Sequence, residues 1–481
     1  MNKTHFLSKF VNKTKPKYNK ILVFKTPKKV KDVLENTLLE TSSDIRINTP
    51  IDYNIVKQKI AESKLPCVGK ASIREIRSLI NAIEKASGKK FIRMEMGVPG
   101  LPASEIGINA EIEALKKGIA NLYPEIEGIP ELKREISRFV KLFLDIDVQE
   151  KSCIPCTGST SGSFVTFLTL ARTNKEKDTV LFLDPGFPVH KMQLRVLGIK
   201  QDNIDVYKFR GEKLHEVLEE KLKAGNISCL LYSNPNNPSW ICFTEKELKI
   251  IGELCQKYDV IPIEDLAYFN MDFRKDYSKP GKEPHQPSVS KYCKDYMILV
   301  SGSKIFSYAG QRIGCIVISD SLFNRDYPDL TRFYSSSNFG HTMIYGSAYT
   351  VSAGVTHSTQ YAFAALLKAV NDGELDFIKE VKVYGERAKK MKKMFLENGF
   401  RIVYDHDDGD PIADGFYFTV AYDGYSGEDL VEQLLYYGIS AISLSNTGSL
   451  RKEGIRACVS LVMDSQLPEL EERLKLFHEN H

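Results

Sequence analysis

The chain has 481 residues, more than one hydrophobic core usually supports, so the sequence predicts at least two domains. Hydrophobic residues make up 42% and charged residues 27%, a globular composition that excludes a fibrous or largely disordered protein. The net charge of +4 includes ten lysines in residues 1–31, so the remaining chain carries about +4 − 10 = −6, which argues against nucleic acid as a partner.

Residues 1–67 are interpreted as an N-terminal extension with no obvious chemistry. Its basic start is either a phosphate-seeking arm or a solvated terminus, and the second reading is favoured. The apolar stretch at residues 6–11 is too short and too interrupted for a secretory signal, and Lys-rich rather than Arg-rich usage favours a cytoplasmic protein. No run approaches the roughly 18 apolar residues that cross a bilayer, so no membrane is expected.

The next segment, residues 72–89, has helical periodicity with Ser72 as a plausible cap. Further along, short apolar runs alternate with amphipathic stretches such as residues 245–258, which favours a mostly parallel sheet covered by helices on both sides. The five runs that predict buried strands are residues 180–183, 227–232, 260–263, 297–300 and 315–318.

From about residue 347 the pattern changes to long helices, such as residues 376–398, and alternating strand-like pieces, such as residues 415–421. This pattern predicts a second domain of the α+β kind. The predicted boundaries are 68–107 for the N-terminal part of the small domain, 108–340 for the large domain and 341–481 for the C-terminal small domain.

Nine cysteines are dispersed among apolar neighbours, as expected for reduced core thiols. Cys153 and Cys156 form a CxxC pair. Without a second pair or nearby histidines this pair is a poor zinc site, so no metal is predicted.

Polar residues cluster directly after the carboxyl ends of the predicted strands, where ligands bind in open α/β sheets. These clusters are SNPNNP (233–238), EDLAY (264–268) and SGSK (301–304), and TGSTSG (157–162) precedes a helical pattern whose N-terminus could hold a phosphate. Four such segments are therefore expected to converge on one phosphorylated ligand.

Lys304 stands at one of these strand ends, where a desolvated ammonium is costly unless it is used chemically. Lysine forms Schiff bases with aldehydes, and a carboxylate such as Asp265 can keep a pyridine nitrogen protonated. Tyr268 and Asn237 could donate hydrogen bonds to the phenolic oxygen of the same ring, and Phe187 could stack on its face. Arg312, eight residues beyond the lysine, offers a permanent positive charge for a phosphate.

In this combination the chain resembles the class I/II aminotransferases of the aspartate aminotransferase superfamily. NPNNP, DxAY and SxSK, followed by an arginine eight residues later, stand in the family's order, and the resemblance covers about residues 68–481. It implies an α/β, PLP-dependent transferase fold of type I. Such a fold has a mostly parallel seven-stranded sheet flanked by helices, and a smaller α+β domain.

The resemblance also implies roles for individual residues. Pyridoxal 5′-phosphate (PLP) is the implied cofactor, held as a Schiff base on Lys304, with Asp265 at the pyridine nitrogen and Tyr268 and Asn237 at the ring oxygen. Phe187 is similar to the aromatic residue that stacks on the ring. The residues that resemble phosphate ligands are Ser159, Thr160, Ser301 and Arg312.

Three further resemblances concern the neighbouring subunit and the substrate. Tyr123 is similar to the family tyrosine that reaches the phosphate of the partner's cofactor, which implies a homodimer with shared active sites. Arg456 resembles the arginine that binds the substrate α-carboxylate, Gly97 resembles the glycine that lines the same carboxylate, and Asn237 would also contact substrate. His190 is either a histidine beneath the nitrogen-binding aspartate or an ordinary packed one.

One departure from the family pattern is Trp240, which replaces the usual glycine after NPNNPS and could narrow the pocket or contact a partner. The predicted function is exchange of an amino group between an L-amino acid and a 2-oxo acid. The alternative on the same fold is a C–S β-lyase or another lyase that proceeds through a Cα carbanion. A transcription regulator with a borrowed PLP domain is disfavoured, because residues 1–66 lack a helix-turn-helix pattern.

Overall fold

The computed structural model describes residues 48–481, and Thr49–His481 form one compact unit. The basic start and most of the predicted extension 1–67 lie outside the described residues. Within the part of the chain that the structure describes, no helix has the length and apolar character that crossing a bilayer requires.

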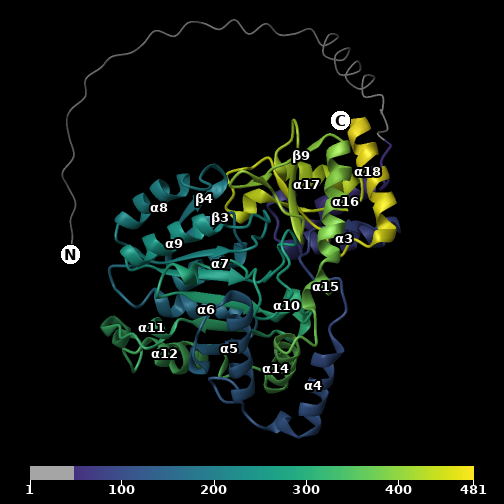
Figure 1. The fold of residues 1–481 in the computed structure, drawn as a ribbon. Helices are drawn as coiled ribbons and strands as arrows, with labels where there is room; N and C mark the ends of the chain where they lie inside the picture. The colour runs from purple at the N-terminus through teal and green to yellow at the C-terminus, as the bar shows by residue number, and fades with distance from the viewer. Residues whose placement is uncertain (1–47) are drawn as a thin grey trace, which may run out of the picture. The chain divides into compact units, whose positions relative to one another are not determined.

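A seven-stranded sheet forms the centre of this unit (Figure 1). The strands β7, β6, β5, β3 and β4 are neighbours in that order and run parallel to one another. Strand β8 runs antiparallel to both of its neighbours, β7 and β2. The order across the sheet is β2 (Cys153–Cys156), β8 (Gly314–Ile318), β7 (Met297–Ser301), β6 (Ile261–Leu266), β5 (Ile227–Ser233), β3 (Thr179–Asp184) and β4 (Lys200–Asp205). The predicted α/β fold with a seven-stranded, mostly parallel sheet is confirmed.

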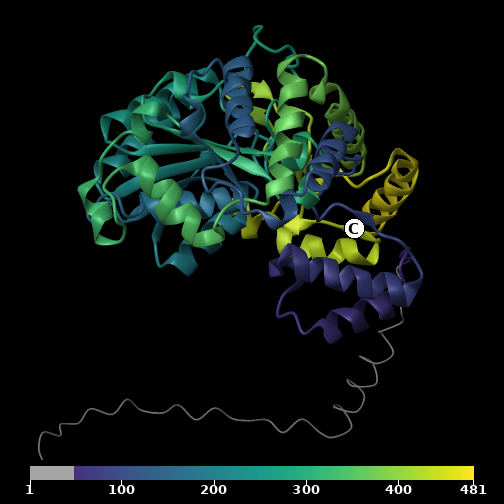
Figure 2. The same ribbon diagram turned by 90° about the horizontal axis from the view of Figure 1, so that it is seen from below.

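Both faces of this sheet are apolar, which is why its strands read as continuous hydrophobic runs. Because successive side chains point to opposite faces, Phe182 and Leu231 join one buried cluster and Leu181 and Leu230 join the other. The first cluster also holds α6 (Ser159–Leu170) and α7 (Pro188–Leu197); the second holds α5 (Pro130–Leu144), α8 (Lys213–Lys223), α9 (Glu245–Lys257) and α14 (His357–Asn371). Helices therefore cover the sheet on both sides (Figures 1 and 2).

A second, antiparallel sheet is built from C-terminal residues. Its order is β14 (Ile442–Ser443), β15 (Ile455–Cys458), β12 (Tyr417–Tyr422) and β9 (Phe400–Ile402). The helices of this region are α16 (Val383–Glu397), α17 (Gly427–Tyr436) and α18 (Leu467–Asn480).

N-terminal residues join this C-terminal region. β1 (Ile92–Arg93) pairs in parallel with β13 (Ile439–Ser440), and α2 (Tyr53–Ser63) and α3 (Ile73–Ser87) contribute to the same core (Figure 2). The strand pair brings the chain that follows β1 to the same place as β15, so two segments far apart in sequence can contribute to one site.

The remaining elements are short or peripheral. They are α4 (Glu105–Lys116), α10 (Gly302–Ile305), α11 (Asp320–Phe323), α12 (Phe339–His341), α13 (Tyr349–Ser352), α15 (Phe377–Val381) and the hairpin of β10 (His406–Asp407) with β11 (Asp410–Pro411).

Local sequence signals explain most helix boundaries. α3 begins with a capping box, in which Ser72 accepts from the Glu75 N–H and the Glu75 carboxylate accepts from the Ser72 N–H. The helical pattern predicted over residues 376–398 is found as two helices, α15 and α16, separated by a one-residue break at Lys382, whose backbone stays helical at φ −58° and ψ −26°. Gly385 follows the break and lowers helix propensity there, and it lies so close to Phe273 that an added Cβ would be 2.7 Å from its ring.

The CxxC pair lies on β2 with its two side chains in different buried clusters, since residues three apart on a strand face opposite sides. Burial raises the pKa of both Cys153 and Cys156 to about 12. All nine cysteines are free thiols.

Candidate active site

A cavity of about 220 Å³ lies at the carboxyl ends of the parallel strands, where it is also lined by residues that follow β1 and residues of β12 and β15. It gathers all the predicted site residues except Tyr123. These are Gly97, Ser159, Thr160, Phe187, His190, Asn237, Asp265, Tyr268, Ser301, Lys304, Arg312 and Arg456.

The strands themselves explain this convergence. Asp265 is the penultimate residue of β6 and Ser301 the last residue of β7, and these two strands are parallel neighbours, so their ends meet at one edge. Lys304 follows one turn later, on α10. Asn237 lies in the loop after β5, the next parallel strand. The topology thus assembles side chains that are dispersed over seventy residues of sequence.

Lys304 is desolvated without a carboxylate partner. Its Nζ donates a hydrogen bond to the backbone oxygen of Gly97 and lies 5.6 Å from the Phe416 ring centre. Burial lowers the pKa of the ammonium to about 8, and the positive charges of Arg456 and Arg312 act in the same direction. An amine with this pKa is partly neutral near neutral pH, which both a nucleophile and a base require.

Asp265 is the one acidic residue among the described residues that line this cavity, and it is buried. It accepts a hydrogen bond from the Ala267 N–H at 3.2 Å, and its Oδ2 lies 3.6 Å from Nε2 of His190. Burial raises the pKa of Asp265 to about 7 and lowers that of His190 to about 4, so the imidazole is neutral and does not pair the carboxylate with a full charge. A protonated ring nitrogen would supply the missing positive partner.

The opposite end of the cavity is suited to an anion. Helix α6 begins at Ser159, so the first N–H groups of its backbone have no partner within the helix. Gly158 precedes it at φ +75°, where an added Cβ would lie 2.5 Å from Nη2 of Arg312. Arg312 also donates to the Ala309 oxygen at 3.0 Å, which holds its guanidinium beside this helix N-terminus. These donors fit the phosphate of PLP.

A second guanidinium lies on the substrate side. Nη1 of Arg456 donates to Oδ1 of Asn237 at 3.1 Å, and Nη2 donates to the backbone oxygen of Glu95 at 2.6 Å. The side chain is almost fully buried, and its Nε has no hydrogen-bond partner among the described residues. A buried guanidinium that contacts only neutral acceptors is suited to receive a carboxylate.

Tyr417 is one of the cavity-lining residues that sequence reasoning did not predict. It lies on β12 and lines the cavity, its hydroxyl is 2.6 Å from the hydroxyl of Tyr268, and its ring lies 4.5 Å from the Arg456 guanidinium carbon. The stretch GFYFTVA offered no signal beyond that of a strand, because β12 is buried along its whole length.

Trp240 lies behind the cavity. It is fully buried, has a left-handed backbone at φ +65°, and makes an edge-to-face contact with Tyr268 at 5.3 Å between ring centres. Gly415 makes room for it, since an added Cβ there would lie 1.9 Å from the indole. The tryptophan thus supports the wall that carries Tyr268, and it faces neither the cavity nor the surface.

Tyr123 lies outside the cavity and is 93% exposed. Its neighbour Leu122 is 57% exposed. Ile112 and Leu115, on the preceding helix α4, are also exposed. Exposed large apolar side chains such as these are common where a protein contacts another protein.

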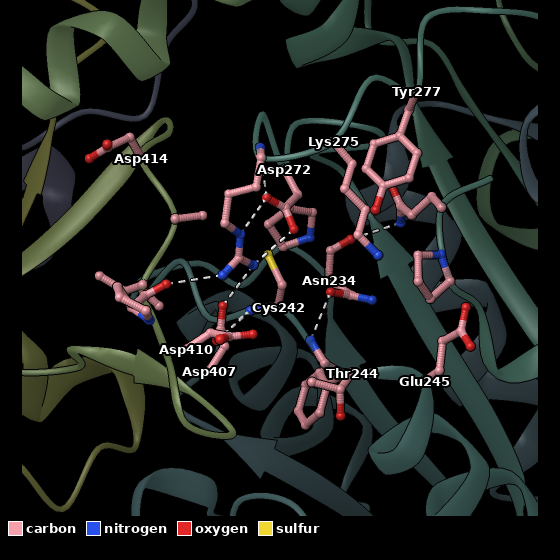
Figure 3. Close-up of a pocket in the computed structure, with 18 residues that line it drawn as sticks. Asn234, Cys242, Thr244, Glu245, Asp272, Lys275, Tyr277, Asp407, Asp410 and Asp414 are labelled. Carbon is pink, nitrogen blue, oxygen red and sulfur yellow. Dashed lines mark hydrogen bonds and ion pairs between the residues drawn. The ribbon is translucent and has the colours of Figure 1, made fainter. Parts of the chain in front are cut away.

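A second, larger cavity of about 530 Å³ shares none of the described lining residues with the first (Figure 3). Arg274 donates to Asp272 at 2.8 Å and to Asp407 at 2.9 Å, and it also donates to the Pro411 oxygen. Behind it, Arg210 donates to the buried Glu247 and to Asp407. Both guanidinium groups here are therefore paired with carboxylates of the fold.

Comparisons with known proteins agree with this geometry. The family model for aminotransferase class I and II matches residues 90–474. An asparagine–oxo-acid transaminase of Streptococcus mutans is 24% identical over 237 residues, and an aspartate aminotransferase of Bacillus subtilis is 25% identical over 246 residues. These matches cover 48% and 50% of this chain, and the chain spans 58% of the length of each relative.

Among solved structures, an alanine aminotransferase from Pyrococcus furiosus superposes with a TM-score of 0.69 at 20% sequence identity. The match covers 86% of this chain and 98% of that one. At this level of identity the likeness concerns the fold.

Proposed function

The chain belongs to the class I and II aminotransferase family, and from that premise we propose that it is a PLP-dependent enzyme that exchanges an amino group between an L-amino acid and a 2-oxo acid. The observation that carries the proposal is the convergence of a desolvated lysine, an unpaired buried carboxylate and an anion-binding helix N-terminus in one cavity. Each of these groups lacks the partner that PLP would supply.

We assign the cofactor contacts as follows. Lys304 would hold the cofactor through its aldehyde carbon, Asp265 would face the ring nitrogen, and Phe187 would lie against the ring. Tyr268 and Asn237 would donate to the ring oxygen. Ser159, Thr160, Ser301 and Arg312 would bind the phosphate.

When bound, PLP supplies an electron-withdrawing ring that acidifies the Cα hydrogen of an attached amino acid. Arg456 binds the α-carboxylate and Gly97 lines it, which orients the Cα–H bond relative to the ring. Lys304 would accept the Cα proton of the substrate, and its pKa of about 8 in the folded chain suits an acid and base near neutral pH.

The proposed reaction can be tested with PLP-loaded protein and single amino acids in the absence of an oxo acid. We expect the absorbance of the lysine-bound cofactor to decrease while pyridoxamine phosphate and a 2-oxo acid accumulate in equal amounts. Release of pyruvate and a thiol without pyridoxamine phosphate would instead identify the C–S β-lyase alternative and overturn the proposal.

We further propose a homodimer in which Tyr123 reaches the phosphate bound by the partner subunit; its exposure and that of Leu122 support this role. To test this shared site, Lys304→Ala protein is mixed with Tyr123→Phe protein under conditions in which subunits exchange. A hybrid dimer would carry both defects in one site and neither in the other, so activity should recover above that of either variant alone. A lack of recovery in verified hybrids would contradict shared sites.

The cytoplasmic location that the composition favours is likewise a proposal, testable by cell fractionation.

A further inference from the structure

Tyr417 joins the two halves of the proposed site. Its hydroxyl lies 2.6 Å from the hydroxyl of Tyr268, the residue assigned to the cofactor's ring oxygen. Its ring lies beneath the guanidinium of Arg456, the residue assigned to the substrate carboxylate, at 4.5 Å from the ring centre to the guanidinium carbon. No motif in the sequence and no assignment above gives this residue a role.

The surroundings hold Tyr417 in one orientation. The side chain is about 1% exposed and contacts the rings of Tyr268 and Trp240 at 5.4 and 6.1 Å between centres. Its hydroxyl is so close to Gly97 that an added Cβ there would lie 1.9 Å from the oxygen. The phenol therefore has little room to move away from Tyr268, and the hydrogen bond between the two hydroxyls is a fixed feature of the fold.

The direction of this hydrogen bond follows from the number of protons. A phenol has one proton to donate. If Tyr268 donates its proton to the ring oxygen of PLP, Tyr417 must be the donor in the bond between the two tyrosines. Burial raises the pKa of both phenols, so both remain protonated over the working pH range. Consecutive hydrogen bonds polarise one another, so the first bond strengthens the second.

We propose that Tyr417 is a positioning residue that transmits the charge state of Arg456 to the hydrogen bond that Tyr268 donates to the cofactor's ring oxygen. The inference rests on the proposed function. A cation over the face of an aromatic ring attracts its electrons and makes the attached hydroxyl a better donor. A carboxylate bound to Arg456 neutralises that cation, so substrate binding weakens the donor chain to the cofactor.

The observable consequence is the apparent pKa read from the absorbance of the lysine-bound cofactor. A hydrogen bond donated to the ring oxygen stabilises the form in which this oxygen is anionic and the cofactor-bonded nitrogen of Lys304 has lost its proton. The hydrogen bond therefore lowers the apparent pKa of the lysine-bound cofactor. The charged or titratable groups that face Lys304 and Tyr268 are Asp265, His190, Arg312, Arg456, Cys458 and Tyr417. Of these, Tyr417 alone is hydrogen-bonded to Tyr268 and in contact with Arg456.

The experiment titrates PLP-loaded wild type, Tyr417→Phe, Tyr268→Phe and the double variant by absorbance, each with and without maleate or acetate. These probes are carboxylates with no amino group to react. We expect Tyr417→Phe to raise the apparent pKa by roughly 0.5 to 1 unit, the size of one hydrogen bond, and to reduce the shift that the carboxylate causes. In the double variant, the Tyr417 change should add nothing to Tyr268→Phe.

Tyr404→Phe is the matched control, since it removes another buried hydroxyl that is bonded to Asp205 and Ser449 and does not line the cavity. It should leave the cofactor titration unchanged. A Tyr417→Phe protein with the wild-type pKa and the wild-type response to carboxylate would overturn this inference while leaving the proposed function intact. Failure of the wild type to take up PLP would overturn both.

Discussion

Two cavities of this chain, the candidate active site and the larger cavity beside Arg274, differ in how their charged side chains are paired. The larger one, about 530 Å³, is bounded by Arg274, whose guanidinium is bonded to Asp272 and Asp407, and Arg210 behind it is bonded to Glu247. In the smaller one, about 220 Å³, Lys304 and Arg456 contact only neutral acceptors. Volume alone would select the larger cavity, whereas unpaired charge selects the smaller.

The physical reason is the cost of desolvation. Leaving a buried charge without a partner is expensive, and a fold tolerates that expense where a ligand will supply the partner. The guanidinium groups of Arg274 and Arg210 already have carboxylate partners within the fold, so we expect these pairs to contribute to stability. Substitutions at the two cavities should therefore separate effects on activity from effects on stability.

The largest effect is expected for Lys304→Ala, which removes the proposed covalent attachment and the proposed Cα base together. Loss of a general acid or base alone costs about 10² to 10⁴ in rate, so transamination should fall by about four orders of magnitude or more. Steady-state assays with a reactive amino acid, together with borohydride trapping of the cofactor, measure it. Because the lysine is desolvated and unpaired, the melting temperature should not fall. Undiminished turnover would refute the assignment.

Arg210→Ala should show the opposite behaviour. The change leaves Glu247 buried without its guanidinium partner, which typically costs about 3 to 5 kcal/mol, and leaves Asp407 paired with Arg274 alone. Chemical denaturation should reveal this loss in the free energy of unfolding, while activity per folded molecule stays near wild type. Lys116→Ala, at an exposed pair with Glu113, is the control and should leave the free energy of unfolding nearly unchanged. A loss of activity without a loss of stability would undermine the contrast.

The sequence predicted the interior of the central sheet better than its edges. The five predicted strands are β3, β5, β6, β7 and β8, whose apolar runs reflect burial on both faces. The two that were not predicted, β2 and β4, are the edge strands. β4 reads KQDNID and is partly exposed, and β2 contains Pro155, so neither has the composition of a central strand. β2 in addition pairs with a strand far along the chain, β8, whereas β4 pairs with β3, the strand before it.

The same distinction applies to the candidate site. Residues in strand-end motifs, such as Asp265 and Lys304, could be predicted because polar groups interrupt apolar runs there. Tyr417 could not, because it stands in a strand that is buried throughout and its role depends on contact with Tyr268, 149 positions away. Trp240 was noticed as a departure from the family pattern, but only the structure locates it against Gly415.

The Asp265→Asn variant tests the same contrast through the pH dependence of the free energy of unfolding. Without cofactor, the folded chain protonates Asp265 with a pKa of about 7, against 3.8 for an ordinary aspartate. Between these values the folded state binds more protons than the unfolded state, so this residue makes the free energy of unfolding fall as pH rises from about 4 to about 7. The slope is at most about 1.4 kcal/mol per pH unit.

Denaturation of the cofactor-free protein across this pH range measures that slope. The Asp265→Asn variant has no titrating group at this position. Its free energy of unfolding should therefore fall less steeply with pH, by up to about 1.4 kcal/mol per pH unit. Glu264 and Asp184, whose pKa values burial also raises, to about 7 and about 6, contribute with the same sign in both proteins and cancel in the difference. Parallel curves for the two proteins would mean that Asp265 is already paired in the folded chain.

The smallest effect is expected for Lys275→Ala at the larger cavity. This lysine lines the cavity but is exposed, so water solvates its ammonium and no buried carboxylate depends on it. A surface change of this kind usually alters stability by no more than about 0.5 kcal/mol, and we expect unchanged turnover and PLP affinity. The result is informative because the same substitution at Lys304 should abolish turnover. A marked loss of activity in Lys275→Ala would show that the larger cavity participates in the reaction, and unpaired charge would then no longer distinguish the two.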